Sequence, residues 1–222
     1  NAGTIRAINN LVVTSAGKIE HTGSLESTSN TQGLVSLQTT QTGDNGNINS
    51  SGSISSKSMS SIDAANHLNI TGNQVIVNQG VVSPLLLSAK GDINVSNAAN
   101  IQNNNLNGDI YLDAKNIRIS ESSQLNSLSN IYLNAEASVD IKNSSQIKAL
   151  SNQNITAQEN IIVSDSTLNS ENGKLNLETN KEDSTISLVN GLIGAKSDFR
   201  IYSGGDLSIY KIKYILKAIK IK

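Results

Sequence analysis

The chain has no cysteine and no tryptophan, and only one proline and one phenylalanine among its 222 residues. Without cysteine, disulfides and most zinc sites are excluded. Aromatic residues make up only 3% of the sequence, too few for a globular core that needs large rings to fill it. The scarcity of proline suits continuous strand ladders, because proline removes a backbone donor and is confined to edges and turns.

Long apolar runs and a strong net charge are also missing. No stretch approaches the roughly 20 apolar residues that a membrane-spanning helix needs, so we expect no stable membrane span. The formal net charge is −1, and residues 1–210 contain 12 basic against 18 acidic residues, so we expect no nucleic-acid partner. The chain begins at Asn1 inside a repeat and carries no signal peptide, so we expect a fragment of a longer protein.

What the sequence does contain is a repeat. A leading apolar residue recurs with a period of about 21–25 residues, which is typical of solenoids. The members of this leading series are Ile62, Leu87, Leu112, Leu133, Ile155, Leu177 and Ile201. Leu37 lies one period before Ile62, and we place Ile5 at the head of a looser and longer first unit.

Each unit has the pattern apolar-x-apolar, turn, apolar-x-apolar, turn, and then an isolated apolar residue such as Ile101, Leu125 or Ile147. Alternation with a period of two indicates strands with one buried and one wet face. The intervening Asn, Ser, Gly and Asp residues are typical of turns, and they interrupt any helical spacing. The sequence therefore predicts an all-β parallel β-helix of about nine coils, with about 21–25 residues in each coil.

This prediction fixes which side chains fill the interior. We expect one set of apolar residues to point inward as aligned stacks, since no other core is available. The set is Ile62, Leu68, Ile70, Leu87, Ile93, Val95, Leu112, Ile117, Ile119, Leu133, Val139, Ile141, Ile155, Ile161 and Val163.

Candidate chemical groups are sparse. His21 and His67 are the only histidines, and with no cluster around them we expect surface turn residues. Asp92, Asp109 and Asp206 follow glycine just before strands, where aspartate accepts hydrogen bonds within turns. We therefore expect no catalytic, cofactor-binding or metal-binding residue, and no cofactor.

The alternative is an array of acids that binds calcium or forms an acid/base pair, as in enzymes that act on polysaccharides. Asp92 and Asp113 lie on different parts of the unit, as do Asp109 and Asp140. We expect the serines of Ser122-Ser123-Gln124 and Ser144-Ser145-Gln146 to form side-chain hydrogen-bond ladders instead of a binding site.

Residues 108–119 (GDIYLDAKNIRI) give the unit in its clearest form. It resembles the haemagglutinin repeats of filamentous-haemagglutinin-like exoproteins, which include adhesins and contact-dependent growth-inhibition proteins. The resemblance covers roughly residues 1–209. It implies a right-handed β-helical rod, export by two-partner secretion through an outer-membrane transporter, and a place at the bacterial cell surface. The chain departs from the family because it has neither an Asn-Pro-Asn-Gly-Ile segment nor a terminal toxin module.

Two functions from different classes follow. One is a non-catalytic shaft segment of a secreted bacterial surface adhesin or contact-dependent inhibition exoprotein, whose partner is a receptor or glycan on a host or bacterial surface. The other is a β-helix lyase or hydrolase that acts on polysaccharides. Five tyrosines, one phenylalanine and scattered acids argue against the enzyme. For specific contacts we expect the irregular loops at residues 27–33, 39–47 and 180–184.

Residues 210–222 (YKIKYILKAIKIK) form a second region, in which five lysines occur without an acid. The spacing fits either an amphipathic helix or an alternating strand. Three interpretations remain: a cap on the open end of the solenoid, a contact with anionic membrane, or a non-native continuation after a truncation or frameshift. We favour the last, because the composition changes abruptly. The β-helix repeat domain then covers residues 1–209.

Overall fold

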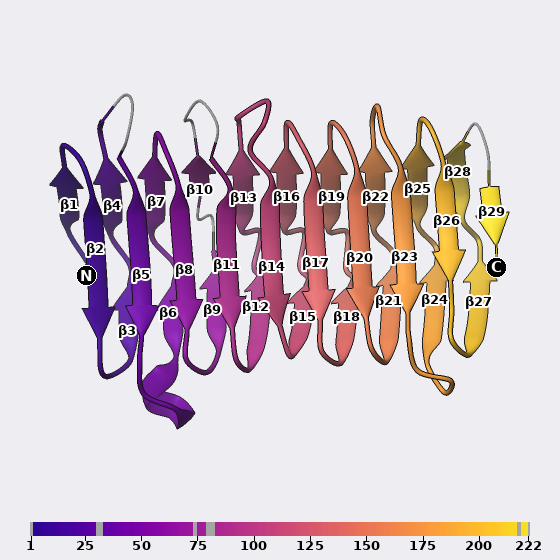
Figure 1. The fold of residues 1–222 in the computed structure, drawn as a ribbon, viewed down its shortest axis with the longest axis horizontal. Coiled ribbons are helices and arrows are strands. Elements are labelled where there is room, and N and C mark those ends of the chain that lie inside the picture. The colour runs from indigo at the N-terminus through magenta and orange to yellow at the C-terminus, as the bar shows by residue number, and fades with distance from the viewer. Residues whose placement is uncertain (1, 30–32, 73–74, 79–82, 217–218, 222) are drawn as a thin grey trace.

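The chain forms a long stack of coils (Figure 1). The structure is a computed structural model that describes residues 2–29, 33–72, 75–78, 83–216 and 219–221. These residues form 29 strands and one short 3₁₀ turn, η1 (Gly43–Gly46). The strands belong to three sheets, A, B and C, and the chain visits the sheets in that order in every coil.

All strand pairs are parallel, and each joins neighbouring coils. Sheet A contains β1 (Thr4–Ala7), β4 (Ser24–Ser27), β7 (Ser53–Ser56), β10 (Val75–Asn78), β13 (Asn100–Asn103), β16 (Gln124–Ser127), β19 (Gln146–Ala149), β22 (Thr167–Ser170), β25 (Leu192–Ala195) and β28 (Lys213–Leu216). Sheet B contains β2 (Leu11–Ser15), β5 (Val35–Thr39), β8 (Ser60–Ala64), β11 (Leu85–Ala89), β14 (Ile110–Ala114), β17 (Ile131–Ala135), β20 (Gln153–Ala157), β23 (Leu175–Thr179), β26 (Phe199–Tyr202) and β29 (Ile219–Ile221). Sheet C contains β3 (Ile19–His21), β6 (Ile48–Ser50), β9 (Leu68–Thr71), β12 (Asp92–Ser96), β15 (Asn116–Ile119), β18 (Ser138–Ile141), β21 (Asn160–Ser164), β24 (Thr185–Val189) and β27 (Asp206–Tyr210).

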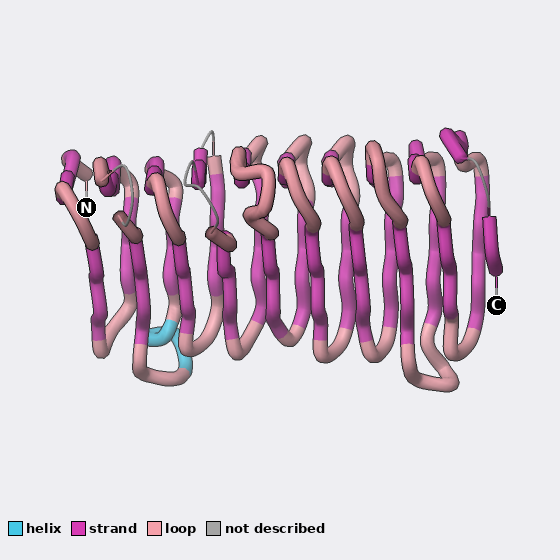
Figure 2. The backbone as a smooth tube through the Cα atoms, turned by 45° about the horizontal axis from the view of Figure 1, so that its top comes forward, coloured by secondary structure: helices cyan, strands magenta, loops and turns pink. Residues whose placement is uncertain are grey.

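The stack is a right-handed parallel β-helix. In Figure 1 the strands of sheet B run downward on the near side, and those of sheets A and C run upward on the far side. The chain advances from left to right. Viewed along the rod axis from the N-terminal end, it therefore turns clockwise as it moves away from the viewer, which is the right-handed sense. Figure 2 shows the three faces joined by bends at the corners of each coil. The fold predicted from the repeat is confirmed.

The core is a set of apolar columns that run along the inside of the coils. Every residue of the predicted inward set is at most 1% exposed. The physical cause is the period of two, since alternate side chains of a strand point to opposite faces. In β17, for example, Ile131 and Leu133 are fully buried, and Asn134 between Leu133 and Ala135 is exposed.

The leading series is also confirmed as a register. From Leu37 to Ile201 its members are Cα partners in successive strands of sheet B. Ile101, Leu125 and Ile147 pair in the same way in sheet A. The isolated apolar residue of each unit is therefore the inward residue of a third strand.

The alignment of the first unit is wrong. Ile5 lies in sheet A and pairs with Leu25, whereas Leu37 pairs with Val13 in sheet B. The sequence around Ile5 has the same apolar-x-apolar pattern as a leading strand, but this pattern does not tell one sheet from another. With Val13 in place of Ile5, the first step falls within the same range as the later ones and no longer stands apart.

The basic C-terminal region continues two of the sheets. Tyr210 is the last residue of β27, and the region then forms β28 and β29, which pair with β25 and β26. Of the two conformations that its periodicity allows, the strand is the one adopted. The sheets thus extend beyond residue 209, where the sequence interpretation ended the repeat domain.

Adjacent residues of β21 test the core directly. Ile161 is fully buried and Ile162 is 40% exposed on the outer face. We predict that Ile161→Asp destabilises the fold by at least the ~1.5–3 kcal/mol that burial of an isoleucine contributes, since it also buries an unpaired charge. The control is Ile162→Asn, because an aspartate there would lie directly opposite Asp140 of the adjacent coil; it should change the free energy of unfolding by less than ~1 kcal/mol. Urea unfolding measures both, and equal losses in the two variants would contradict the inward columns.

Candidate functional site

The turns from sheet B to sheet C, called the B–C corner here, differ in length. Five consecutive turns, which leave β8, β11, β14, β17 and β20, have only one to three residues. Each follows a buried alanine that ends the strand of sheet B: Ala64, Ala89, Ala114, Ala135 and Ala157. Because alanine is small, the chain can bend close to the core. The corner is therefore narrow over five coils.

Threonine replaces this alanine where the corner carries a longer loop. Thr39 precedes the loop 40–47, and Thr179 precedes the loop 180–184. The Thr39 hydroxyl donates to the Gly46 carbonyl at 2.6 Å and accepts from the Ala65 N–H at 3.0 Å. The Thr179 hydroxyl accepts from the Ser184 hydroxyl at 2.7 Å and from the Gly204 N–H at 3.3 Å. Each buried threonine therefore satisfies polar groups at the base of its loop.

Both loops project from the same edge of the rod, below sheet B in Figure 1. Two of the three loops predicted as contact regions are therefore present, although their bases Thr39 and Ser184 are buried. In the third, residues 30–32 lie outside the described residues, and Ser27 is the buried end of β4. The sequence interpretation missed a further loop at residues 104–109, where Leu106 is 68% exposed.

A trough of about 490 Å³ runs along the narrow part of the B–C corner. Its floor consists of the alanines Ala89, Ala114, Ala135 and Ala157. One wall, the outer row, consists of outward residues of sheet B: Asp63, Ser88, Asp113, Asn134 and Thr156. The other wall, the turn row, consists of Lys90, Glu136, Gln158 and Asn180, which begin the turns.

The outer row is held by its own hydrogen bonds. Ser88 donates to Asp63 at 2.8 Å, and Gln38 donates to the second oxygen of Asp63 at 3.2 Å. Asn134 donates to Asp113 at 2.8 Å and accepts from Thr156 at 2.9 Å. Because neighbours in the row come from neighbouring coils, these bonds fix the wall along the rod axis.

Tyr111 and Tyr132 extend the same face beside the trough. Their rings stack with centroids 4.7 Å apart and planes inclined by 7°. Burial and a hydrogen bond to Asp109 at 3.0 Å raise the pKa of Tyr111 to about 12. Since the two residues are Cα partners in adjacent coils, each ring covers the other ring's face. They stabilise the stack and leave mainly their edges to the solvent.

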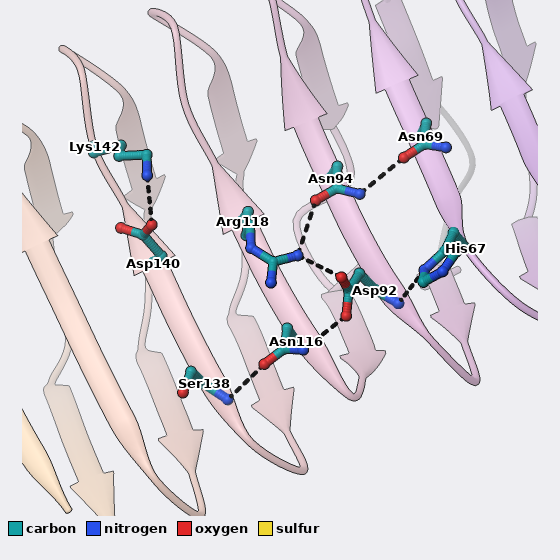
Figure 3. A network of polar contacts seen from close by, with 9 residues as sticks. All are labelled: His67, Asn69, Asp92, Asn94, Asn116, Arg118, Ser138, Asp140 and Lys142. Atoms are coloured by element: carbon teal, nitrogen blue, oxygen red, sulfur yellow. Dashed lines mark hydrogen bonds and ion pairs between the residues drawn. The ribbon is translucent and has the colours of Figure 1, made fainter.

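Sheet C carries a polar network on its outer face (Figure 3). Asn69, Asn94 and Arg118 lie in successive coils and are joined by hydrogen bonds of 2.8 and 3.4 Å. Arg118 also forms an ion pair with Asp92, and Asn116 donates to Asp92 at 2.7 Å. Burial acts to raise the pKa of Asp92, but the bonds from Asn116 and Arg118 outweigh it and hold this pKa below its ordinary value.

The roles predicted for the aspartates need correction. Asp92 and Asp109 do not bond mainly within their own turns, because their carboxylates accept hydrogen bonds from the next coil. Asp109 accepts from the backbone N–H and the side-chain amide of Asn130, at 3.1 and 2.9 Å. Asp206 is the exposed first residue of β27, with no side-chain hydrogen bond within the described residues. Two carboxylates thus connect coils, which spacing along the sequence could not reveal.

His21 is not a surface residue. It ends β3, is 1% exposed, and its Nδ1 lies 2.8 Å from the Ser50 hydroxyl. Burial lowers the pKa of its imidazole. His67 does lie in a turn, where its Nδ1 accepts the Asp92 N–H at 2.9 Å.

A glycine in the next coil lies against each histidine. A Cβ on Gly52 would come within 2.8 Å of His21, and a Cβ on Gly91 within 2.6 Å of His67. In the sequence, a glycine about one coil length after each histidine was the feature that could have indicated that the histidine packs against the next coil.

The serine ladder predicted at residues 122–124 and 144–146 does not form. Gln124 and Gln146 are in register, but Ser145 donates to the Lys142 carbonyl at 2.7 Å, and the buried Ser123 hydroxyl has no hydrogen-bond partner within the described chain. Asparagine forms the ladders instead, because its amide both donates and accepts. One example runs from Asn130 to Asn152 at 3.0 Å.

The acids remain distributed over different faces. As expected, Asp92 lies in sheet C and Asp113 in sheet B. The sequence interpretation missed that Asp63 and Asp113 lie in one column, separated by Ser88. Within the described part of the chain, no three His, Cys, Asp or Glu side chains are placed to hold a metal ion.

No protein-family model, curated protein or solved structure matches the chain. The described residues also contain no helix with the length and apolar character that crossing a bilayer requires.

The role of the Thr179 hydroxyl at the base of its loop can be tested by replacing threonine with valine at two positions. Thr179→Val keeps the side-chain shape but leaves buried polar partners at the base of a loop without their hydroxyl. We predict a loss of ~1–3 kcal/mol in the free energy of unfolding. Thr156→Val, in the solvated outer row, should cost less than ~0.5 kcal/mol. Urea unfolding of both variants measures these free energies. A smaller loss of stability for Thr179→Val than for Thr156→Val would contradict the role of the Thr179 hydroxyl in anchoring the loop.

His21 predicts a pH dependence of stability. Its pKa in the folded state lies below the ordinary value, so its contribution is complete above about pH 6.5, the pKa in the unfolded chain. As the pH falls below that value, the unfolded chain binds the proton first and the fold loses stability. We expect His21→Leu to weaken the decrease in thermal midpoint between pH 7.5 and 5. A decrease of the same size in His21→Leu as in the unmodified protein would contradict this account.

Proposed function

We propose that the chain is a non-catalytic shaft segment of a secreted bacterial surface adhesin or contact-dependent inhibition exoprotein. The observation that carries this proposal is the continuity of the three sheets along the whole described chain. Nine steps between the ten strands of sheet A, at about 4.8 Å each, correspond to a rod of roughly 43 Å. Such a rod suits a spacer that presents binding regions away from a cell.

The outer surface supports the same role. Its polar side chains form hydrogen bonds and ion pairs between coils, such as Lys148 with Glu171 and Lys181 with Glu159, both at 2.8 Å. Longer loops are confined to corners, so they can vary without interrupting a strand. The resemblance of the repeats to those of filamentous-haemagglutinin-like exoproteins points to the same function. With it, the proposal includes an outer-membrane transporter for export and a surface receptor or glycan as the partner.

Surface labelling tests this proposal. Antibodies raised against the purified segment should label intact cells of the source bacterium, and external protease should remove the label. An inner-membrane or cytoplasmic protein serves as the control that must stay inaccessible. Labelling that appears only after the cells are permeabilised would contradict a surface shaft.

One observation favours the enzymatic alternative, a polysaccharide lyase or hydrolase. Asp63, Asp113 and Glu136 line one trough, and glycoside hydrolysis uses two carboxylates on either side of the scissile bond. Release of new chain ends from a panel of polysaccharides measures it. We expect no cleavage by the segment. Cleavage that disappears in Asp113→Asn would replace the shaft proposal with an enzyme.

A further inference from the structure

The trough at the B–C corner contains several polar groups that the described part of the fold leaves unpaired. Elsewhere many charged side chains are paired, as Arg118 is with Asp92 and Lys142 with Asp140. In the turn row, Lys90, Glu136 and Gln158 line the trough, and their side chains form no hydrogen bond or ion pair within the described residues. The outer row adds Asp113, of which only one oxygen accepts a hydrogen bond from the described chain. The trough therefore offers donors and acceptors that the fold does not use.

The trough also has the shape for an extended ligand. Its two walls follow the rod axis. The outer row has one residue in each of five coils, at the coil spacing of about 4.8 Å, whereas the turn row has a gap at the coil of Lys115, which is not part of the lining. The alanine floor leaves space between the walls, and Asn180, the first residue of one projecting loop, belongs to the lining. A ligand in this trough would lie along the rod and meet at least one polar side chain in each coil.

We infer that the trough binds a neutral glycan chain laid along the rod axis. Carboxylates, amides and hydroxyls all form hydrogen bonds with sugar hydroxyl groups, and those with a carboxylate are the stronger ones. An extended peptide fits less well, because peptides that dock on sheets use an unpaired strand edge, and here the backbone of β8, β11, β14, β17 and β20 is paired on both sides. An anionic polymer is disfavoured by three acids against the single lysine of the lining.

This inference rests on the proposed function, since it names the class of glycan that a surface shaft would contact. Cleavage is no part of it. Binding without cleavage supports both the shaft and the trough, whereas surface labelling without glycan binding leaves the shaft in place and removes the trough site.

Affinity electrophoresis of the full segment tests the site. The probes are a mixed-linkage β-glucan and a galactomannan as neutral chains, polygalacturonate as an acidic chain and polylysine as a basic one. We expect a neutral chain to retard the segment, and the double variant Asp113→Ala/Glu136→Ala to weaken that binding at least tenfold. The control Glu171→Ala removes an acid at the corner between sheets A and B and should bind as the unmodified segment does. Equal thermal midpoints establish that all three proteins are folded.

Three results would overturn the inference. The first is that neither neutral chain retards the segment. The second is that the double variant binds a neutral chain as tightly as the unmodified protein does. The third is that polygalacturonate or polylysine binds the segment more tightly than both neutral chains do. Preference for polylysine that depends on Asp113 and Glu136 would assign the trough to a basic partner.

Discussion

The backbone register between neighbouring coils is the constraint on which the rest of the structure depends. Every strand pairs in parallel with the strand one coil away, so each residue lies about 4.8 Å from the equivalent residue of the next coil. A side chain that fits at one level must therefore fit against the same position above and below it. Inside the rod this produces columns such as the one from Leu37 to Ile201, and outside it produces rows such as Asn69, Asn94 and Arg118. Repetition in the sequence is the consequence of this spacing.

The length of the connections varies at the corners, where the chain leaves the sheets. Alanine at the end of a sheet B strand accompanies a turn of one to three residues, and threonine at Thr39 and Thr179 accompanies a longer loop. The threonine hydroxyl satisfies the polar groups that a longer loop brings to its base, as the bonds to Gly46 and Ser184 show. The trough lies along four successive alanine turns, those after Ala89, Ala114, Ala135 and Ala157. A change from alanine to threonine at this position therefore accompanies the change from a short turn to a longer loop.

The sequence predicts features that follow from period two and from the coil length. The inward residues from Ile62 to Val163 and the leading register are of this kind, since each depends on neighbours along the chain. Ile5 was misplaced because a strand pattern does not say to which sheet a strand belongs. The burial of His21 was missed because its neighbours Ser50 and Gly52 come from the next coil. The trough was missed because Asp63, Ser88 and Asp113 come from three successive coils and meet in one column. Spacings of one coil length between these polar residues were the available indication, but they acquire meaning only when the register is known.

Disulfide trapping measures the register most directly, because the natural chain contains no cysteine. Asn134 and Thr156 are Cα partners in adjacent coils, at a separation of about 4.8 Å that a disulfide can bridge. Asn134 and Asn154 are offset by two residues on the same face, which puts their Cα atoms roughly 8 Å apart, too far for a disulfide. The double variant Asn134→Cys/Thr156→Cys should therefore cross-link rapidly under mild oxidation, and Asn134→Cys/Asn154→Cys should not. Equal cross-linking of both pairs, or preferential cross-linking of the offset pair, would contradict the stacked-coil structure.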